Sequence, residues 1–482
     1  MSLKQQVAHN TIAQIAGKAV STALGVITIM IMTRALGVER FGWYITATSF
    51  LQFFGIISDF GFTVVTANML SEPRFDKKKL FDTLFTIRFF TALLLNCIAP
   101  LSIMLFPYPA PIKIATAIMT ISFFSVYLNQ VFVAYYQVKL RMHIQAIGEV
   151  ISRAALVVGA ALAAHQNWGF LPLVTVVALA ALTNTVYLWL KSEGVRLAFD
   201  KEIGSAVWHK MWPVAISVIF NAFYLQGDKV ILPLYASQTD VGIYGAATRV
   251  IETIIPVPAL LMGTMLPLLT FSWSRKDNKN FAQRAQWSFN IVNLFLLPTV
   301  AGILAISTAL MIFVAGSDFA GSGAILAVLS WKLIGISFGM IFSHFLLAAG
   351  KQKLSMWVYI IDAILCVAGF MYFIPKYGLY GAAGVSLFSE IFAGLGLSIL
   401  AIHQLRFVPH FVDFAKISLA SAIMGYAIYS LQPIHIIWSL LLGAIIYSLL
   451  IYIFGVVKKE MIKEIIGPKK FPTEPPSEIP VV

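Results

Sequence analysis

Long apolar runs alternate with short polar segments along the whole chain. A helix needs about 20 mostly apolar residues to cross the hydrocarbon core of a bilayer, and backbone groups in lipid must be hydrogen-bonded within the segment. The pattern therefore predicts an all-α polytopic membrane protein with about 14 transmembrane helices. The expected spans are residues 10–36, 41–70, 83–106, 111–138, 144–165, 168–190, 207–235, 241–271, 287–315, 322–349, 355–374, 378–403, 414–431 and 434–457.

The composition agrees with a chain that is dissolved mostly in lipid. Hydrophobic residues make up 59% of it and charged residues 11%, whereas a soluble domain has roughly 25% charged residues. No loop between the expected spans is long enough to form a soluble domain. The first run, 10–36, is too long for the apolar core of a signal peptide, and no small-residue cleavage site follows it. Cys97 and Cys366 both lie in apolar runs, so we interpret them as small core residues.

Lysine and arginine are distributed asymmetrically between alternate loops. If the N-terminus is cytoplasmic, 24 of the 34 Lys and Arg residues fall in cytoplasmic segments, and the opposite loops carry only Arg40, Lys113 and Lys376. This positive-inside pattern predicts that both termini are cytoplasmic. It also accounts for the net charge of +13 through topology and contact with anionic lipid, so no nucleic-acid partner is expected. The Pro- and Lys-rich end, 458–482, is predicted to be a disordered cytoplasmic tail.

A short motif occurs twice, two hundred residues apart. The segment GWYITAT begins at Gly42, and GIYGAAT begins at Gly242. They share glycine, tyrosine (Tyr44 and Tyr244), alanine and threonine, and half of the pattern returns at Gly378. Packing explains these residue types individually, because glycine permits a tight turn, tyrosine suits the membrane interface and alanine lets helices approach closely.

The spacing of the motif adds information about domain organisation. The offset corresponds to six expected helices, and each copy opens a helix that descends from the outer surface. Parallel repeats of this kind are typical of secondary transporters, in which the substrate path lies between the halves. We therefore predict two six-helix bundles, 1–195 and 196–405, related by a parallel pseudo-two-fold axis. Residues 406–457 would add two further transmembrane helices.

The residues around both motifs resemble a known family. The run TRALGVERFGWY, from Thr33 to Tyr44, is similar to the first-helix signature of polysaccharide-biosynthesis flippases, which are Wzx-like members of the MATE/MOP exporter superfamily. The segment from Asp228 to Val250 resembles the seventh and eighth helices of the same family. The resemblance implies two six-helix bundles around a central cavity, often with two extra helices.

The resemblance also implies a function. Members of this family move undecaprenyl-diphosphate-linked oligosaccharide repeat units, such as those of O-antigen, across the bacterial cytoplasmic (inner) membrane by alternating access. The expected partners are the lipid-linked glycan, the bilayer, a coupling proton or sodium ion, and other polysaccharide-assembly proteins.

Three alternatives to this function remain open. One is a drug or cation antiporter of the same superfamily, whose usual form has twelve helices. Another is a lipid II flippase, whose first helix is typically richer in arginine. The third, a membrane-embedded polymerase or ligase, normally carries a large outer loop that this chain lacks. We expect no enzyme and no cofactor, since no P-loop, HExxH or paired-cysteine motif occurs.

Several cations inside the expected spans are candidates for binding a diphosphate. Arginine offers phosphate a bidentate fork and lysine a point charge. Lys18 and Lys332 are the strongest candidates, because neither has an acidic residue within four positions on its own helix. The alternative interpretation is a lysine that pairs across helices or reaches an interface. The full set of candidate cavity cations is Lys18, Arg153, Lys229, Arg249 and Lys332.

Charges inside a membrane are costly unless they are paired or hydrated, so some of these cations are expected to be neutralised. Glu149 and Arg153 are spaced i,i+4, and Arg249 and Glu252 are spaced i,i+3 on one helix. Asp228 and Arg249 lie at similar distances from their shared outer turn and are also expected to be able to pair. For each pair, structural neutralisation and a role in binding or coupling both remain open.

The remaining intramembrane charges divide into acids and arginines. Asp59, Asp362 and Glu390 are candidates for carrying a coupling proton or sodium ion. Arg34 and Arg88 are expected to reach the outer and inner membrane surfaces by snorkelling.

Overall fold

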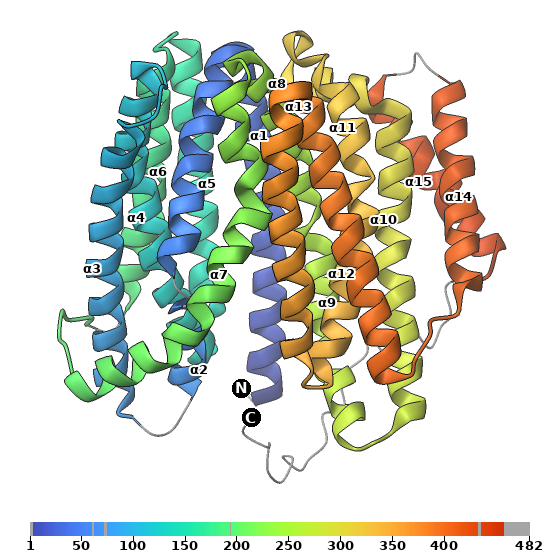
Figure 1. Cartoon of the computed structure of the whole chain (residues 1–482), viewed down its shortest axis with the longest axis horizontal. Helices are drawn as coiled ribbons and strands as arrows, with labels where there is room; N and C mark the ends of the chain where they lie inside the picture. Colours follow the sequence, from blue (N-terminus) through green and yellow to red (C-terminus); the bar gives the residue numbers. More distant parts are fainter. Residues whose placement is uncertain (1–2, 60–61, 72–74, 193, 432–434, 457–482) are drawn as a thin grey trace.

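The computed structural model of the chain describes residues 3–59, 62–71, 75–192, 194–431 and 435–456. The predicted tail, 458–482, lies outside these described residues. Within them every regular element is helical, and most helices run roughly along one common direction (Figure 1). The prediction of an all-α polytopic membrane protein is confirmed.

The first half of the chain supplies helices α1 to α6. Their bounds are α1 Leu3–Asp59, α2 Phe62–Ser71, α3 Lys77–Ile103, α4 Ala110–Val138, α5 Met142–His165 and α6 Phe170–Lys191. A straight helix as long as α1 would measure about 85 Å, far more than a bilayer core of about 30 Å. Gly37 breaks α1 with φ 68° and ψ 176°, so that α1 has two arms. The second arm and α2 together occupy the expected span 41–70.

The second half supplies α7 to α13 and a short 3-10 segment. Their bounds are α7 Lys201–Tyr235, α8 Gln238–Ile254, α9 Pro256–Ser274, α10 Asn278–Ala315, η1 Ser317–Phe319, α11 Ser322–Ser330, α12 Lys332–Ala348 and α13 Gln352–Leu405. α8 and α9 form one expected span, which is interrupted at Pro256 because proline lacks the N–H that would continue the helix. α11 and α12 likewise share one span, with a bend at Trp331.

Helix α13 is a hairpin that reverses at Gly378. This residue has φ 52° and ψ −129°, in the region that favours glycine. The two arms pack closely beyond it: a Cβ at Gly381 would lie 2.4 Å from the carbonyl oxygen of Phe373, and one at Gly369 would lie 3.0 Å from Val385 Cγ1. Small residues thus let the two arms approach closely.

The chain ends in two further helices, α14 Phe411–Ser430 and α15 Ile436–Ile453. Within the described residues, 11 helical segments are long and apolar enough to cross a membrane, and two of these contain the breaks at Gly37 and Gly378. The expected total of 14 spans, the boundaries at residues 195 and 405, and the pseudo-two-fold axis stay predictions.

Helix contacts gather into two groups, which we call the N-terminal bundle (α1–α6) and the C-terminal bundle (α7–α13). α1 packs against both, touching α4 and α5 on one side and α7 and α8 on the other. α1 begins at one end of the molecule, here called the Leu3 end, and its first arm runs to the opposite end, where the chain turns back (Figure 1). The break in α1 is at Gly37, so this opposite end is called the Gly37 end. α14 and α15 lie along the outside of α10.

Candidate functional site

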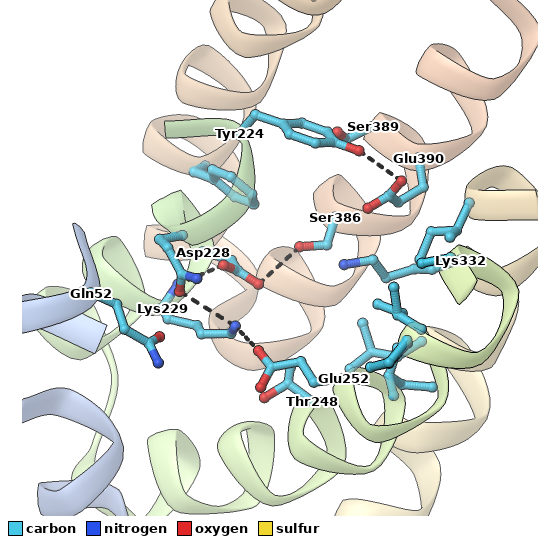
Figure 2. Close-up of a pocket in the computed structure, with 18 residues that line it drawn as sticks. Gln52, Tyr224, Asp228, Lys229, Thr248, Glu252, Lys332, Ser386, Ser389 and Glu390 are labelled. Atoms are coloured by element: carbon cyan, nitrogen blue, oxygen red, sulfur yellow. Dashed lines mark hydrogen bonds and ion pairs between the residues drawn. The ribbon is translucent and has the colours of Figure 1, made fainter. Parts of the chain in front are cut away.

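A cavity of about 510 Å³ opens between α1 and the C-terminal bundle, and polar side chains from several helices reach into it (Figure 2). Its size falls within the roughly 300–1,000 Å³ of small-ligand sites. The charged groups that line it are three carboxylates and two lysines. They are Asp228 and Lys229 of α7, Glu252 of α8, Lys332 of α12 and Glu390 of α13. α1 contributes Gln52.

Two cations share one carboxylate at the α8 side of the cavity. Arg249 Nη1 donates to Glu252 Oε2 at 2.9 Å, and Lys229 Nζ forms an ion pair with Glu252 Oε1. Lys229 also donates to Gln226 Oε1 at 3.4 Å. The expected pair between Arg249 and Glu252 is therefore confirmed, and Lys229 joins it from α7. Two positive charges against one negative charge leave this cluster with a formal charge of +1.

Asp228 is held by hydroxyl groups instead of by the expected arginine. Tyr244 Oη donates to Asp228 Oδ2 at 2.6 Å, and Ser386 Oγ donates to the same oxygen at 3.2 Å. Asp228 is 5% exposed and Tyr244 is 1% exposed. The expected pair between Asp228 and Arg249 is wrong, because Arg249 is directed to Glu252, one turn further along its own helix.

Two further candidate acids of the C-terminal bundle lie on α13. Tyr224 Oη donates to Glu390 Oε2 at 2.7 Å, at the wall of the cavity. Asp362 is fully buried behind this wall, where Ser389 Oγ donates to its Oδ2 at 2.9 Å and Cys366 Sγ lies 3.7 Å from its Oδ1. The structure thus places two of the three candidate coupling acids beside the cavity, Glu390 on its surface and Asp362 one layer deeper.

Lys332 projects into the same cavity. Figure 2 shows its amino group directed between Glu390 and the cluster around Glu252. Among the residues that the structure describes, its Nζ makes no hydrogen bond or ion pair within 4.0 Å. An ammonium group in this position can bind an additional anionic group without first breaking an ion pair.

Lys18, the other favoured lysine, lies elsewhere and is paired. Its Nζ is 3.3 Å from Glu149 Oε1, which also accepts a hydrogen bond of 3.0 Å from Ser21 Oγ. The expected pair between Glu149 and Arg153 is therefore wrong, because α1 brings Lys18 to Glu149 from across the interface with α5. Arg153 is exposed and has no hydrogen bond or ion pair with the described side chains. These three residues belong to the N-terminal bundle and do not line the cavity.

Asp59 also belongs to the N-terminal bundle and is paired. Its Oδ1 lies 2.7 Å from Arg88 Nη2, and Arg88 also donates to Gln130 Oε1 and to the carbonyl oxygen of Tyr127. Arg88 is 2% exposed, so the expectation that it snorkels to the inner surface is wrong: α4 supplies its hydrogen-bond partners inside the bundle. Arg34, by contrast, is exposed and donates to the carbonyl oxygens of Phe313 and Val314 at the end of α10.

The duplicated motif has a different structural role from the one expected. Gly42 and Gly242 both lie inside helices, and the tight turn in the first copy is made by Gly37 instead. Tyr244 is buried against Asp228 and does not belong to an interfacial aromatic belt. Tyr44 is partly buried and packs against the ring of Phe41, with the ring centroids 5.9 Å apart.

Several polar residues of the site were not expected from the sequence. Tyr224, Gln52 and Thr248 line the cavity, and Ser386 and Ser389 hold its acids. One signal was present: the run GVSLFSEIF places two serines and a glutamate within five positions of an otherwise apolar span. Tyrosine and single polar residues are too common in membrane helices to stand out in the same way.

The arrangement can bind groups of both signs. Lys332 and the cluster at Glu252 offer positive charge, whereas Asp228, Glu390 and the buried Asp362 offer carboxylate oxygens. Among the described residues, no group of three or more His, Cys, Asp or Glu side chains is placed to hold a metal ion.

Proteins that resemble this chain are named for the transport or flipping of glycans. It is 25% identical over 353 residues to the succinoglycan biosynthesis transport protein ExoT of Rhizobium meliloti, covering 72% of this chain and 70% of that protein. It is 23% identical over 396 residues to a putative O-antigen transporter of Shigella flexneri, covering 78% and 92%. A probable low-salt glycan biosynthesis flippase, Agl15 of Haloferax volcanii, is 21% identical, covering 52% and 55%.

Solved structures share the fold. The lipid II flippase MurJ in an inward closed conformation has a TM-score of 0.74 at 17% identity, covering 93% of this chain and 98% of that one. An inward-facing multidrug resistance MATE family transporter of the MOP superfamily has a TM-score of 0.64 at 12% identity, covering 82% and 98%. The family model described as polysaccharide biosynthesis protein matches residues 31–324, which is more than half of the sequence. The chain therefore belongs to the polysaccharide biosynthesis protein family.

Proposed function

We propose that this protein flips undecaprenyl-diphosphate-linked oligosaccharides across the bacterial cytoplasmic membrane. In this proposal the Leu3 end and the C-terminal tail are cytoplasmic, as the distribution of Lys and Arg predicts, and the Gly37 end faces outward. The two bundles rock about the cavity, so that the site is exposed to one side of the membrane at a time.

One observation carries the proposal: Lys332 extends into a cavity within the membrane-spanning bundle without an ion-pair partner among the described side chains. A charge in this position is costly unless it is paired or hydrated, and an intramembrane charge that faces a cavity commonly serves a ligand. A diphosphate is a concentrated anion, and Lys332 together with the positively charged cluster of Lys229, Arg249 and Glu252 would balance it. The glycan would extend beyond the 510 Å³ cavity, and the polyprenyl tail would stay in the bilayer.

The names of the relatives support a glycan as cargo. One is named for succinoglycan transport, one for O-antigen transport, and one as a glycan flippase. Membership of the polysaccharide biosynthesis family is consistent with the same class of substrate. It also favours a transporter over an enzyme, and it suggests that other polysaccharide-assembly proteins work beside this one.

Glu390 and Asp362 are the proposed sites for a coupling proton or sodium ion. Glu390 lies on the cavity wall with one hydrogen bond from Tyr224, and Asp362 lies behind it with Ser389. Asp59 is a weaker candidate, because Arg88 already neutralises it. A cation that binds at Glu390 would neutralise its negative charge and make the cavity more positive, which offers a route by which ion binding favours the binding of an anionic substrate and ion loss favours its release.

The carboxylates also support a second candidate function, export of a cationic drug. Asp228, Glu252 and Glu390 all reach the cavity, and carboxylates attract organic cations. A lipid II flippase is a third candidate, which differs from the first in the saccharide attached to the diphosphate. These candidates make different demands on Lys332: an anionic cargo requires it, whereas a cationic cargo is repelled by it.

Complementation tests the proposal. The wild type is expressed in a bacterium that lacks its own O-unit flippase, with host and glycan matched to the source, and surface polysaccharide is scored. Lys332→Ala and Lys18→Ala are compared at equal membrane levels. Lys376→Ala is the control, because Lys376 does not line the cavity and instead stacks on the ring of Tyr372, with its Nζ 3.7 Å from the ring centroid. We expect the wild type and the control to restore polymer and Lys332→Ala to fail.

Other outcomes separate the candidates. If the wild type gives no polymer but lowers the accumulation of cationic drugs, the antiporter replaces the proposal. If it rescues only a strain depleted of its lipid II flippase, the cargo is lipid II. If Lys332→Ala works as well as wild type, flipping stands but the assignment of the lysine is wrong.

A further inference from the structure

The two copies of the duplicated motif contact each other. A Cβ at Gly42 would lie 1.8 Å from the carbonyl oxygen of Gln238, and a Cβ at Gly242 would lie 2.1 Å from the carbonyl oxygen of Val38. Val38 precedes Gly42 by four residues, and Gln238 precedes Gly242 by four residues. Each glycine therefore packs against the backbone of the other copy, at the residue one helical turn before that copy's glycine. The contact is thus reciprocal.

Neighbouring residues extend this contact between the second arm of α1 and α8. A Cβ at Gly245 would lie 2.5 Å from Ile45 Cγ1, and Thr46 Oγ1 donates to Gln238 Oε1 at 2.9 Å. The obstacle at Gly42 and at Gly242 is backbone, which cannot move aside by changing rotamer. Only glycine at these two positions permits the approach.

The contact lies between the cavity and the Gly37 end of the molecule. Gln52, on the second arm of α1, and Glu252, on α8, both line the cavity. Each follows its motif glycine by ten residues, or about 15 Å along a helix. The same two helices thus lie side by side near the Gly37 end (Figure 1), and both also line the cavity.

We propose that the reciprocal contact of Gly42 and Gly242 is the closed outer gate of the transport path. This inference rests on the proposed function in one respect, namely that cargo leaves the cavity at the Gly37 end. For that exit, α8 must separate from the second arm of α1 at the two glycines. The duplication of the motif follows directly, because a gate made of two equivalent helix surfaces needs the same small residue on both sides.

A crosslink tests the gate with both glycines in place. Thr46→Cys and Gln238→Cys are combined in a Cys97→Ala background, since Cys97 is exposed, and treated with a short, reducible bifunctional thiol reagent. We expect the two cysteines to crosslink, flipping to stop in the crosslinked fraction, and reduction to restore it. The single-cysteine variants, treated in the same way, should keep flipping. Full crosslinking with undiminished flipping would overturn the proposal.

Alanine at either glycine tests the same contact by preventing it from forming. In Gly242→Ala or Gly42→Ala the added methyl group forces the helices apart by roughly 1.5 Å to reach ordinary contact distance. We expect most of the Thr46→Cys/Gln238→Cys crosslink to be lost. We also expect a cysteine introduced at Gln52 to react faster with a membrane-impermeant maleimide added outside cells.

The control for the alanine variants is Gly25→Ala on the first arm of α1, where an added Cβ meets nothing within 4 Å. It should crosslink and label like the parent. If Gly242→Ala also matches the parent in both measurements, the glycines are not a gate. If an alanine variant fails to reach the membrane, the crosslink on the native glycines decides.

Failure of the gate and failure of the proposed function are distinguishable. Crosslinking and labelling report on the position of α8 against α1 and need no substrate. A chain that opens at the glycines but flips no lipid-linked saccharide would support the gate and refute the proposed cargo. A chain that flips the lipid-linked saccharide while permanently crosslinked would support the proposed cargo and refute the gate.

Discussion

The ion pair between Arg88 and Asp59 is expected to stabilise the N-terminal bundle, and its removal gives a measurable prediction. Arg88, on α3, is 2% exposed and donates to Asp59 of α1, at 2.7 Å, and to Gln130 and the Tyr127 carbonyl oxygen of α4. Its guanidinium also lies 5.2 Å from the ring centroid of Phe62 of α2. One side chain therefore connects four helices.

The change is Arg88→Met, which keeps most of the volume and removes the charge. Breaking a buried pair by removing one partner costs about 3–5 kcal/mol, because the other charge is left uncompensated. The Asp59 side chain is 18% exposed, so water relieves part of this penalty and we expect about 3 kcal/mol. Since about 1.4 kcal/mol is a factor of ten, the unfolding equilibrium should shift by roughly a hundredfold.

The double variant Arg88→Met/Asp59→Asn removes both charges. Its cost should be smaller than the cost of Arg88→Met, about 1–2 kcal/mol, because only neutral hydrogen-bond groups are then left unpaired. The assay is denaturant unfolding of the purified protein in detergent, followed by circular dichroism. Lys353→Met, at an exposed position, is the control and should stay within about 0.5 kcal/mol of wild type.

One result would refute this reasoning: a double variant destabilised by the sum of the two single variants, which would show that the two charges are not coupled. The same double variant also tests the role of Asp59 in transport. If it flips substrate at the wild-type rate once its membrane level is matched, Asp59 is a structural group and not a coupling acid.

Three further predictions concern the cavity. Lys332→Met should weaken the apparent affinity for the lipid-linked substrate about tenfold to a hundredfold, because it removes one hydrogen bond to a charged group. The assay is flipping in proteoliposomes, in which Lys376→Met should behave as wild type. Glu390→Gln should flip at a rate that no longer responds to an imposed proton or sodium gradient, since the amide keeps the shape but cannot change charge; an unchanged response would remove Glu390 from coupling. Tyr244→Phe should lower the free energy of unfolding by about 1.5–3 kcal/mol through loss of its bond to a buried carboxylate, whereas Tyr426→Phe, at a side chain 75% exposed, should change it by under about 0.5 kcal/mol.

The hydrophobic pattern was sufficient to locate most helices. The expected spans 144–165 and 168–190 coincide closely with α5 and α6, at Met142–His165 and Phe170–Lys191. This works because the bilayer imposes one length and one secondary structure on every span. The pair of Arg249 and Glu252 was predictable for a similar reason: helix geometry alone places residues i and i+3 together.

Partners on different helices could not be predicted in the same way. Glu149 has Arg153 one turn away on its own helix, yet it binds Lys18, which is 131 positions distant in the sequence. The choice depends on how α1 and α5 are rotated about their axes and how closely they approach. A Cβ at Gly17 would lie 2.6 Å from Ala146 Cβ, so small residues beside the charged pair set that distance. Such information is distributed over two helices and is absent from either one alone.

Helix α8 connects the candidate gate with the charges of the cavity, because its different faces make different contacts. Gly242 and Gly245 face the second arm of α1. Tyr244, between them in the sequence, binds Asp228 of α7, and Glu252, further along, binds Lys229 of the same helix. Residues 242 and 244 differ by about 200° around a helix, since successive residues are about 100° apart. If α8 separates from α1 at the glycines, it can therefore keep its position against α7 only if α7 moves with it. Either the two hydrogen-bonded links to Asp228 and Lys229 break, or α7 and α8 move as one body. A ligand that competes for Asp228 or Glu252 favours the first route, and a ligand that leaves both links intact favours the second.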